Sequence, residues 1–182
     1  MTFFNSFFGM AYVMLMPIFA VDILDVGAKG QGLLLGMSGA GALVNTLYIG
    51  ARGSVPHRGL AIIAGAVLFG LAVAAFALTA EYVGSLSLAM GLMFIMGIFN
   101  SLYMISIQSS LQIMVPDRMR GQVMGFYGMT WSIMPLGGLQ ASALTSIWNA
   151  PIAIAAGGLA VAAFALGTSL FNSTVRNLSS NL

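Results

Sequence analysis

Neutral polar side chains recur at helical intervals within apolar segments of this chain, and they are its clearest candidates for chemistry. Ser101, Gln108 and Gln112 are separated by seven and four residues, which places them within about 40° of one another on a helix. Asn100 and Tyr103 flank this stripe. The stripe predicts either a hydrogen-bonding wall for a polar permeant or interhelical bonds that lock a bundle, each worth about 0.6–2 kcal/mol. Both interpretations stay open for Asn100, whereas Gln112, near the end of its segment, favours the second.

Three further segments carry similar polar stripes, accompanied by aromatic and methionine residues. Methionine adapts its shape to irregular surfaces, so such walls suit bulky amphipathic ligands. The sequence therefore predicts a largely neutral path for a small organic substrate. Its candidate residues are Asn5, Tyr12, Ser38, Asn45, Asn100, Ser101, Tyr103, Gln108, Tyr127, Thr130 and Trp131.

Residues suited to catalysis or metal binding are sparse. The chain has no cysteine, and no ionisable residue lies inside its apolar runs, so we expect no metal and no cofactor. The tetrapeptide Gly36-Met37-Ser38-Gly39 matches the Gly-x-Ser-Gly of rhomboid-type intramembrane proteases. A serine nucleophile needs a base within hydrogen-bond reach, and the only histidine, His57, follows Ser38 by nineteen residues in a polar connection. We therefore expect no enzyme and keep the protease as a minor alternative.

The elements that must position these side chains are long apolar runs. Hydrophobic residues make up 59% of the chain and charged residues 5%, which is far below the roughly 25% charged residues of a soluble domain. Each run approaches the ~20 residues that a helix needs to cross a bilayer. We predict an all-α membrane protein surrounded by lipid, with six transmembrane helices at about 3–21, 32–51, 60–80, 83–115, 123–147 and 152–171, and a polar tail at 172–182.

The six predicted helices divide into two sets of three. Runs 60–80 and 152–171 contain almost only apolar residues, so we expect them to face lipid while the other four line a polar region. Phe4-Asn5-Ser6 recurs as Phe99-Asn100-Ser101 in the corresponding helix. Because three crossings reverse direction, the sequence predicts two inverted three-helix repeats.

The basic residues report orientation and form no patch for nucleic acid. Five arginines fall in connections on one side or in the tail, and only Lys29 lies on the other side. The bias predicts cytoplasmic termini for a multi-pass protein of the plasma (bacterial inner) membrane. Compact basic connections can also cap helices and pair with acidic partners. The candidate gating residues in them are Arg52, Arg58, Asp117, Arg118, Arg120 and Gly121.

At these connections the chain resembles a known family. Residues 115–121, Val-Pro-Asp-Arg-Met-Arg-Gly, followed by Val123-Met124-Gly125, are similar to the loop between helices ten and eleven of major facilitator superfamily transporters. The glycine-rich run 32–51 and the connection 52–59 resemble that family's helix eight and the following loop. The resemblance implies half of a major-facilitator fold, the C-terminal six helices, and is nearest to the branch of siderophore exporters, drug antiporters and transmembrane secretion effectors. Gln122 departs from the arginine often found there.

Two functions follow from this interpretation. The first is transport, with efflux as the expected direction, of a small organic molecule by alternating access. The second is a truncated or split-gene fragment without transport activity of its own. The partner considered is a separate N-terminal six-helix half or a second copy of the chain, and the fragment alternative also allows a chain that pairs with nothing.

Overall fold

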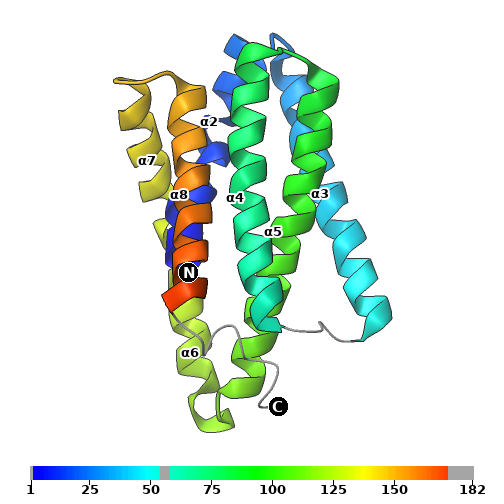
Figure 1. Cartoon of the computed structure of the whole chain (residues 1–182), viewed down its shortest axis with the longest axis vertical. Helices are drawn as coiled ribbons and strands as arrows, with labels where there is room; N and C mark the ends of the chain where they lie inside the picture. The colour runs from blue at the N-terminus through cyan, green and yellow to red at the C-terminus, as the bar shows by residue number, and fades with distance from the viewer. Residues whose placement is uncertain (1, 54–57, 172–182) are drawn as a thin grey trace.

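A computed structural model describes residues 2–53 and 58–171, and it is all-α over these ranges (Figure 1). The first segment combines α1 (Thr2–Phe4), the π-helical turn η1 (Asn5–Gly9), α2 (Ala11–Ile18) and a second π-helical turn, η2 (Phe19–Ile23). The long helices α3 (Gly27–Arg52), α4 (Arg58–Tyr82) and α5 (Leu86–Met114) follow. The described chain ends with α6 (Asp117–Met129), the 3₁₀ turn η3 (Trp131–Ile133), α7 (Met134–Thr145) and α8 (Ala150–Phe171).

Two connections are shorter than the sequence predicts. The predicted connection at 22–31 is mostly helical, because α3 begins at Gly27 after a tight turn in which Asp25 and Gly27 have φ angles of 51° and 61°. Aspartate and glycine are the residue types that adopt this left-handed conformation. The predicted connection at 116–122 is also helical, since α6 begins directly after Pro116. A proline is tolerated there because the first turn of a helix needs no donated N–H.

The predicted helix at 123–147 is interrupted in the structure. Pro135 has no N–H to donate to the carbonyl of Trp131, and its ring crowds that carbonyl, so a regular α-helix cannot pass through this region. The chain instead forms η3, in which the Met134 N–H bonds the Trp131 carbonyl. Five other described segments are long and apolar enough to cross a membrane: Thr2–Ile23, Gly27–Arg52, Arg58–Tyr82, Leu86–Met114 and Ala150–Ser169.

The packing of the helices differs from the expected division into two lipid-facing helices and four helices that line a polar region. α4 lies between α5 and α8, and α3 packs on the far side of α5 (Figure 1). The first segment packs against α7 and α8. The expectation that run 60–80 mainly faces lipid is wrong, because 61% of its most apolar stretch is buried against 17% in α3. Alanines and glycines let both neighbours approach α4 closely, which leaves exposed the leucines of a narrow stripe, Leu60, Leu68, Leu71 and Leu78.

Glycines set the closest helix contacts. A Cβ atom at Gly41 of α3 would overlap the carbonyl of Phe94 in α5, and one at Gly97 of α5 would overlap the carbonyl of Ser38 in α3. Gly70 of α4 and Gly158 of α8 face one another's backbones in the same way. Small residues let membrane helices approach until their backbones touch, and the packing that results replaces the hydrophobic force that lipid cannot supply.

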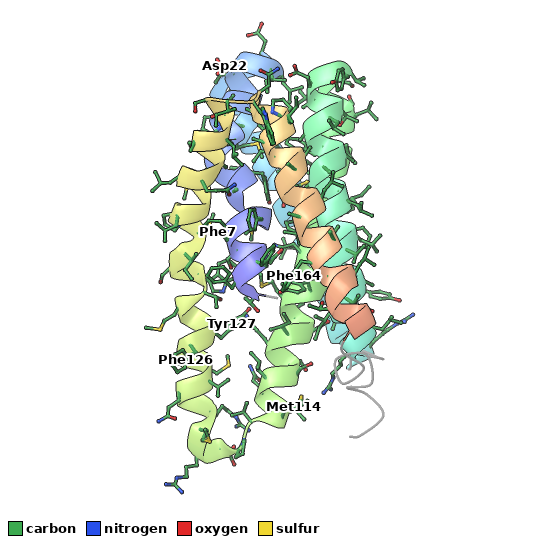
Figure 2. All side chains as sticks on the ribbon, turned by 60° about the vertical axis from the view of Figure 1, so that its left-hand side comes forward. Phe7, Asp22, Met114, Phe126, Tyr127 and Phe164 are labelled. Atoms are coloured by element: carbon green, nitrogen blue, oxygen red, sulfur yellow. The ribbon has the colours of Figure 1, made fainter. Side chains whose placement is uncertain are left out.

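Charged side chains gather at the two ends of the bundle. Asp22, Asp25 and Glu81 follow or end the helices that finish at one end, called here the acidic end, where Lys29 also lies. Arg52, Arg58, Arg118 and Arg120 lie where helices meet at the opposite end, called the arginine end. Figure 2 shows Asp22 at the first end and Met114 toward the second. The predicted segregation is therefore present among the described residues, whereas the tail with Arg176 lies outside them.

Substitution of the two glycines at the α3–α5 contact, Gly41 and Gly97, tests this packing. We expect Gly41→Ala and Gly97→Ala each to destabilise the bundle by about 1–3 kcal/mol, because the added methyl meets backbone rather than a movable side chain. Thermal unfolding in detergent measures the effect. Gly39→Ala in the same helix is the control, since no atom lies within 4 Å of a Cβ built there. It should be neutral or stabilising by up to about 1 kcal/mol. Equal melting temperatures for all three variants would contradict the close α3–α5 contact.

Candidate substrate path

Two of the predicted path residues bond one another between α3 and α5. The Asn45 Nδ2 donates to the Ser101 Oγ at 3.3 Å, and the Thr46 hydroxyl lies 3.1 Å from the same oxygen. Ser101 in turn donates to the Ala42 carbonyl at 3.3 Å. For Asn45 and Ser101 the structure therefore shows the interhelical lock, which was one of the two interpretations of this stripe.

Tyr12 and Ser38 meet between the first segment and α3. Tyr12 is buried in the core, and its ring centroid lies 6.4 Å from that of Phe69 in α4. Its hydroxyl is next to the half-buried Ser38 side chain. A hydroxyl pair at a helix contact can bond internally or exchange one partner for a polar ligand.

Asn5 lies inside the bundle rather than along an open wall. Its side chain is 1% exposed, and a Cβ at Gly9 would come within 2.7 Å of its Oδ1 and 3.0 Å of the Phe69 ring. Within the described part of the chain, neither the amide nitrogen nor the amide oxygen of this side chain has a hydrogen-bond partner, and the adjacent Ser6 hydroxyl has none either. Gly9 leaves the space that this amide occupies at the π-helical turn η1.

Asn100 and Tyr103 of α5 also carry unpaired polar atoms. Among the described residues the Asn100 Oδ1 and the Tyr103 hydroxyl make no hydrogen bond. Tyr103 is 1% exposed, packs against Gly65 of α4 and has the Thr2 side chain near its hydroxyl. A buried polar atom left without a partner costs about 1–3 kcal/mol. Such atoms in native proteins usually bond ordered water or a ligand. These positions can therefore accept or donate bonds that this arrangement does not supply.

A second polar contact joins α5 to α6 in the half nearer the arginine end. The Gln108 Nε2 donates to the Tyr127 hydroxyl at 3.4 Å, and that hydroxyl donates to the Met104 sulfur at 3.3 Å. Figure 2 labels Tyr127 between these helices. Gln108 is exposed, so this contact is accessible from outside the bundle. It combines an amide, a phenol and a thioether without any formal charge.

The remaining predicted path residues lie around the break in the predicted helix 123–147. The Thr130 hydroxyl donates to the Tyr127 carbonyl of its own helix at 2.6 Å, and Trp131 is 36% exposed in η3. A shallow hollow of about 540 Å³ follows the outer face of α6 and is lined by Gln122, Gly125, Phe126 and Met129. The exposed part of the candidate path is therefore aromatic, methionine-rich and neutral.

The candidate gating residues at 117–121 lie in a helix and not in the connection that the sequence predicts there. Asp117 and Arg120 belong to the first turn of α6 and form an ion pair with each other at 2.8 Å. Arg118 and Gly121 are exposed in the same helix. Arg52 ends α3 with its guanidinium 4.4 Å from the centre of the Tyr48 ring. Arg58 begins α4, and residues 54–57, including His57, lie outside the described part of the chain.

Three further side chains in these contacts were missed from the sequence. Thr46 shares the Ser101 oxygen, Met104 accepts from Tyr127, and Ser6 is buried beside Asn5. The repeated Phe-Asn-Ser tripeptide could have identified Ser6 as a candidate. No sequence pattern identifies Thr46 or Met104, because their partners are 55 and 23 residues away in sequence. The described residues contain no group of three or more acidic or histidine side chains that could hold a metal ion.

Comparison with known proteins places the chain in a family. The sequence pattern of the family described as Major Facilitator Superfamily matches residues 1–181. No curated protein and no solved structure matches the chain.

A double-mutant cycle measures the lock between α3 and α5. We expect Asn45→Ala and Ser101→Ala to be coupled by about 0.6–2 kcal/mol in unfolding free energy, because they share one interhelical bond. The control cycle pairs Asn45→Ala with Thr130→Val, which removes a hydroxyl bonded only to its own helix. The control pair should be additive. Coupling of the same size in both cycles would mean that the Asn45–Ser101 bond does not hold the helices together.

Proposed function

Because the chain belongs to the Major Facilitator Superfamily, we propose that it moves a small organic molecule across the bilayer by alternating access, in the direction of efflux. The chain is a multi-pass membrane protein of a family of transporters, and it is not an enzyme. The serine of the protease-like tetrapeptide is consistent with this, since Ser38 lies at the close α3–α5 contact.

One observation carries the proposed substrate class. The Gln108–Tyr127–Met104 contact is accessible and uncharged, and the separate hollow on the outer face of α6 is lined by Phe126 and Met129. Amides and phenols orient polar groups of a ligand, while methionine and aromatic surfaces accept irregular apolar bodies. These features together favour a neutral or weakly polar amphipathic molecule over a small ion.

Unpaired polar atoms support a second arrangement of the helices. Asn5 and Asn100 occupy equivalent positions in the repeated tripeptide, and the amide oxygen of each has no hydrogen-bond partner in residues 2–53 and 58–171. Burying these atoms without a partner costs free energy. A state in which they bond water or substrate avoids that cost and is favoured by the same amount. The π-helical turn at Asn5–Gly9 and the break at Thr130 lie where two helices could bend between such states.

The proposed arrangement has the six helices as the C-terminal half of a major-facilitator transporter, built from two inverted three-helix repeats. The arginine end would lie in the cytoplasm together with both termini, at the plasma (bacterial inner) membrane. A separate N-terminal six-helix half or a second copy of the chain would complete the path. The exposed apolar side chains of the sparsely buried α3, among them Leu43 and Leu47, offer a surface for that partner.

Efflux of the neutral amphipathic dye Nile red tests this proposal in the native host after deletion of the gene and complementation. We expect Gln108→Ala and Tyr127→Phe to slow efflux several-fold, because each removes part of the accessible polar contact. Gln112→Ala is the matched control, since Gln112 is exposed one turn further along α5, and it should leave efflux unchanged at equal membrane abundance.

Two outcomes would count against the proposal. If cells with and without the wild-type chain release the dye and a wider panel of amphipathic compounds equally fast, the chain is an inactive fragment. If Gln112→Ala slows efflux as much as Gln108→Ala does, the Gln108–Tyr127 contact is not the substrate path.

A further inference from the structure

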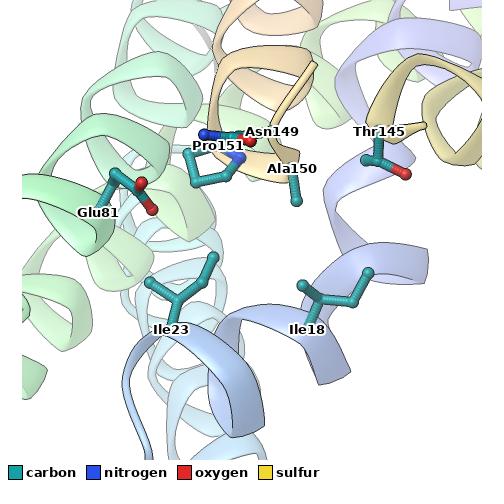
Figure 3. Close-up of a pocket in the computed structure, with 7 residues that line it drawn as sticks. All are labelled: Ile18, Ile23, Glu81, Thr145, Asn149, Ala150 and Pro151. Carbon is teal, nitrogen blue, oxygen red and sulfur yellow. The ribbon is translucent and has the colours of Figure 1, made fainter. Parts of the chain in front are cut away.

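A separate cavity of about 380 Å³ opens at the acidic end of the bundle (Figure 3). The first segment, the end of α4, the end of α7 and the start of α8 meet there, and the polar path residues described above take no part in it. Its volume falls in the lower part of the range found for small-molecule sites. The lining residues are Ile18, Ile23, Glu81, Thr145, Asn149, Ala150 and Pro151.

Negative charge borders this cavity. Helices end at Ile23, Tyr82 and Thr145 beside it, and α8 begins there. Each helix C-terminus carries the equivalent of about half a negative charge. The helix α3, which carries Lys29, and α5 also begin at this end, but neither contributes a residue that lines the cavity. Glu81 adds a full charge in the last turn of α4, a turn that contains no basic residue. Among the described residues Glu81 has no ion-pair partner.

Each polar side chain that lines the cavity can accept a hydrogen bond. The Thr145 hydroxyl donates to the Ser142 carbonyl at 2.6 Å, which commits its hydrogen and leaves its lone pairs available. Asn149 contributes an amide oxygen, and Glu81 contributes two carboxylate oxygens. Figure 3 shows Glu81, Asn149 and Thr145 around the opening, with Ile18 and Ile23 on the opposite wall. The site therefore combines acceptors for a cationic head with an apolar surface for its body.

We propose that this cavity binds a small organic ammonium ion, with its N–H groups directed to Glu81 and its apolar body against Ile18 and Ile23. A hard inorganic cation is disfavoured, because calcium and magnesium require six or more oxygen ligands around them and half of this lining is apolar. The inference does not depend on the proposed transport function, since it concerns equilibrium binding at the acidic end.

Calorimetric titration of the full chain in phosphatidylcholine nanodiscs tests the site, with 2-phenylethylammonium as the probe and 2-phenylethanol as its neutral counterpart. We expect one saturable site for the ammonium ion and at least tenfold weaker binding to Glu81→Gln. Asp22→Asn is the matched control, because it removes the same charge from the same end at an exposed position that does not line the cavity. It should change the affinity less than threefold.

A second variant separates the cavity from its charge. Ile18→Trp keeps Glu81 and fills the apolar side, so it should also weaken binding at least tenfold. Absence of saturable binding to the wild type would overturn the proposal. Equal losses in Glu81→Gln and Asp22→Asn, or wild-type affinity in Ile18→Trp, would each overturn it as well, because the ammonium ion would then be held only by the general charge of the surface. Equal affinity for the neutral alcohol would also overturn it, because the charge of the ammonium ion would then contribute nothing to binding.

Discussion

Lipid as the surrounding solvent is the constraint on which the rest of this structure depends. Hydrocarbon offers no hydrogen bonds to the backbone, so each apolar run must satisfy its own N–H and carbonyl groups as a helix. It also offers no hydrophobic force between helices. Association then depends on close van der Waals contact, which explains why Gly41, Gly97, Gly70 and Gly158 lie where backbones touch. The same constraint leaves the charged side chains at the two ends of the bundle.

Polar side chains inside such a bundle either bond one another or keep atoms without a partner, and both cases occur here. Asn45 and Ser101 satisfy one another and fix α3 against α5. Asn5, Asn100 and Tyr103 retain polar atoms without a hydrogen-bond partner among the described residues, and each such atom costs stability. A protein that changes the relative positions of its helices needs contacts of both kinds, because the first keep each unit rigid while the second favour a different partner in another state.

Sequence patterns predicted the helical runs and the gathering of the described arginines at one end of the bundle, because length and polarity reflect the bilayer directly. The patterns failed where packing against a neighbouring helix decides which residues are buried or bonded. α4 was expected to face lipid, yet its alanine-rich faces pack α5 and α8, which no periodicity reveals. A single helix was expected at 123–147, but the chain leaves the α-helix at Thr130, ahead of Pro135. Asn45 and Ser101 were both identified as polar candidates. Their hydrogen bond to each other could not be predicted, because it joins residues 56 positions apart that only the folded chain brings together.

The most direct test uses the absence of cysteine from the chain, because single cysteines can be introduced without background labelling. Gln108→Cys places a thiol on the accessible polar contact, and Leu71→Cys places one on the exposed leucine stripe of α4. A water-soluble maleimide in native membranes should modify the Gln108→Cys variant rapidly and the Leu71→Cys variant hardly at all, since lipid covers that stripe. Equally rapid labelling of the two variants would show that water surrounds the bundle, and equally slow labelling would show that water does not reach the Gln108 contact; either result would contradict the account.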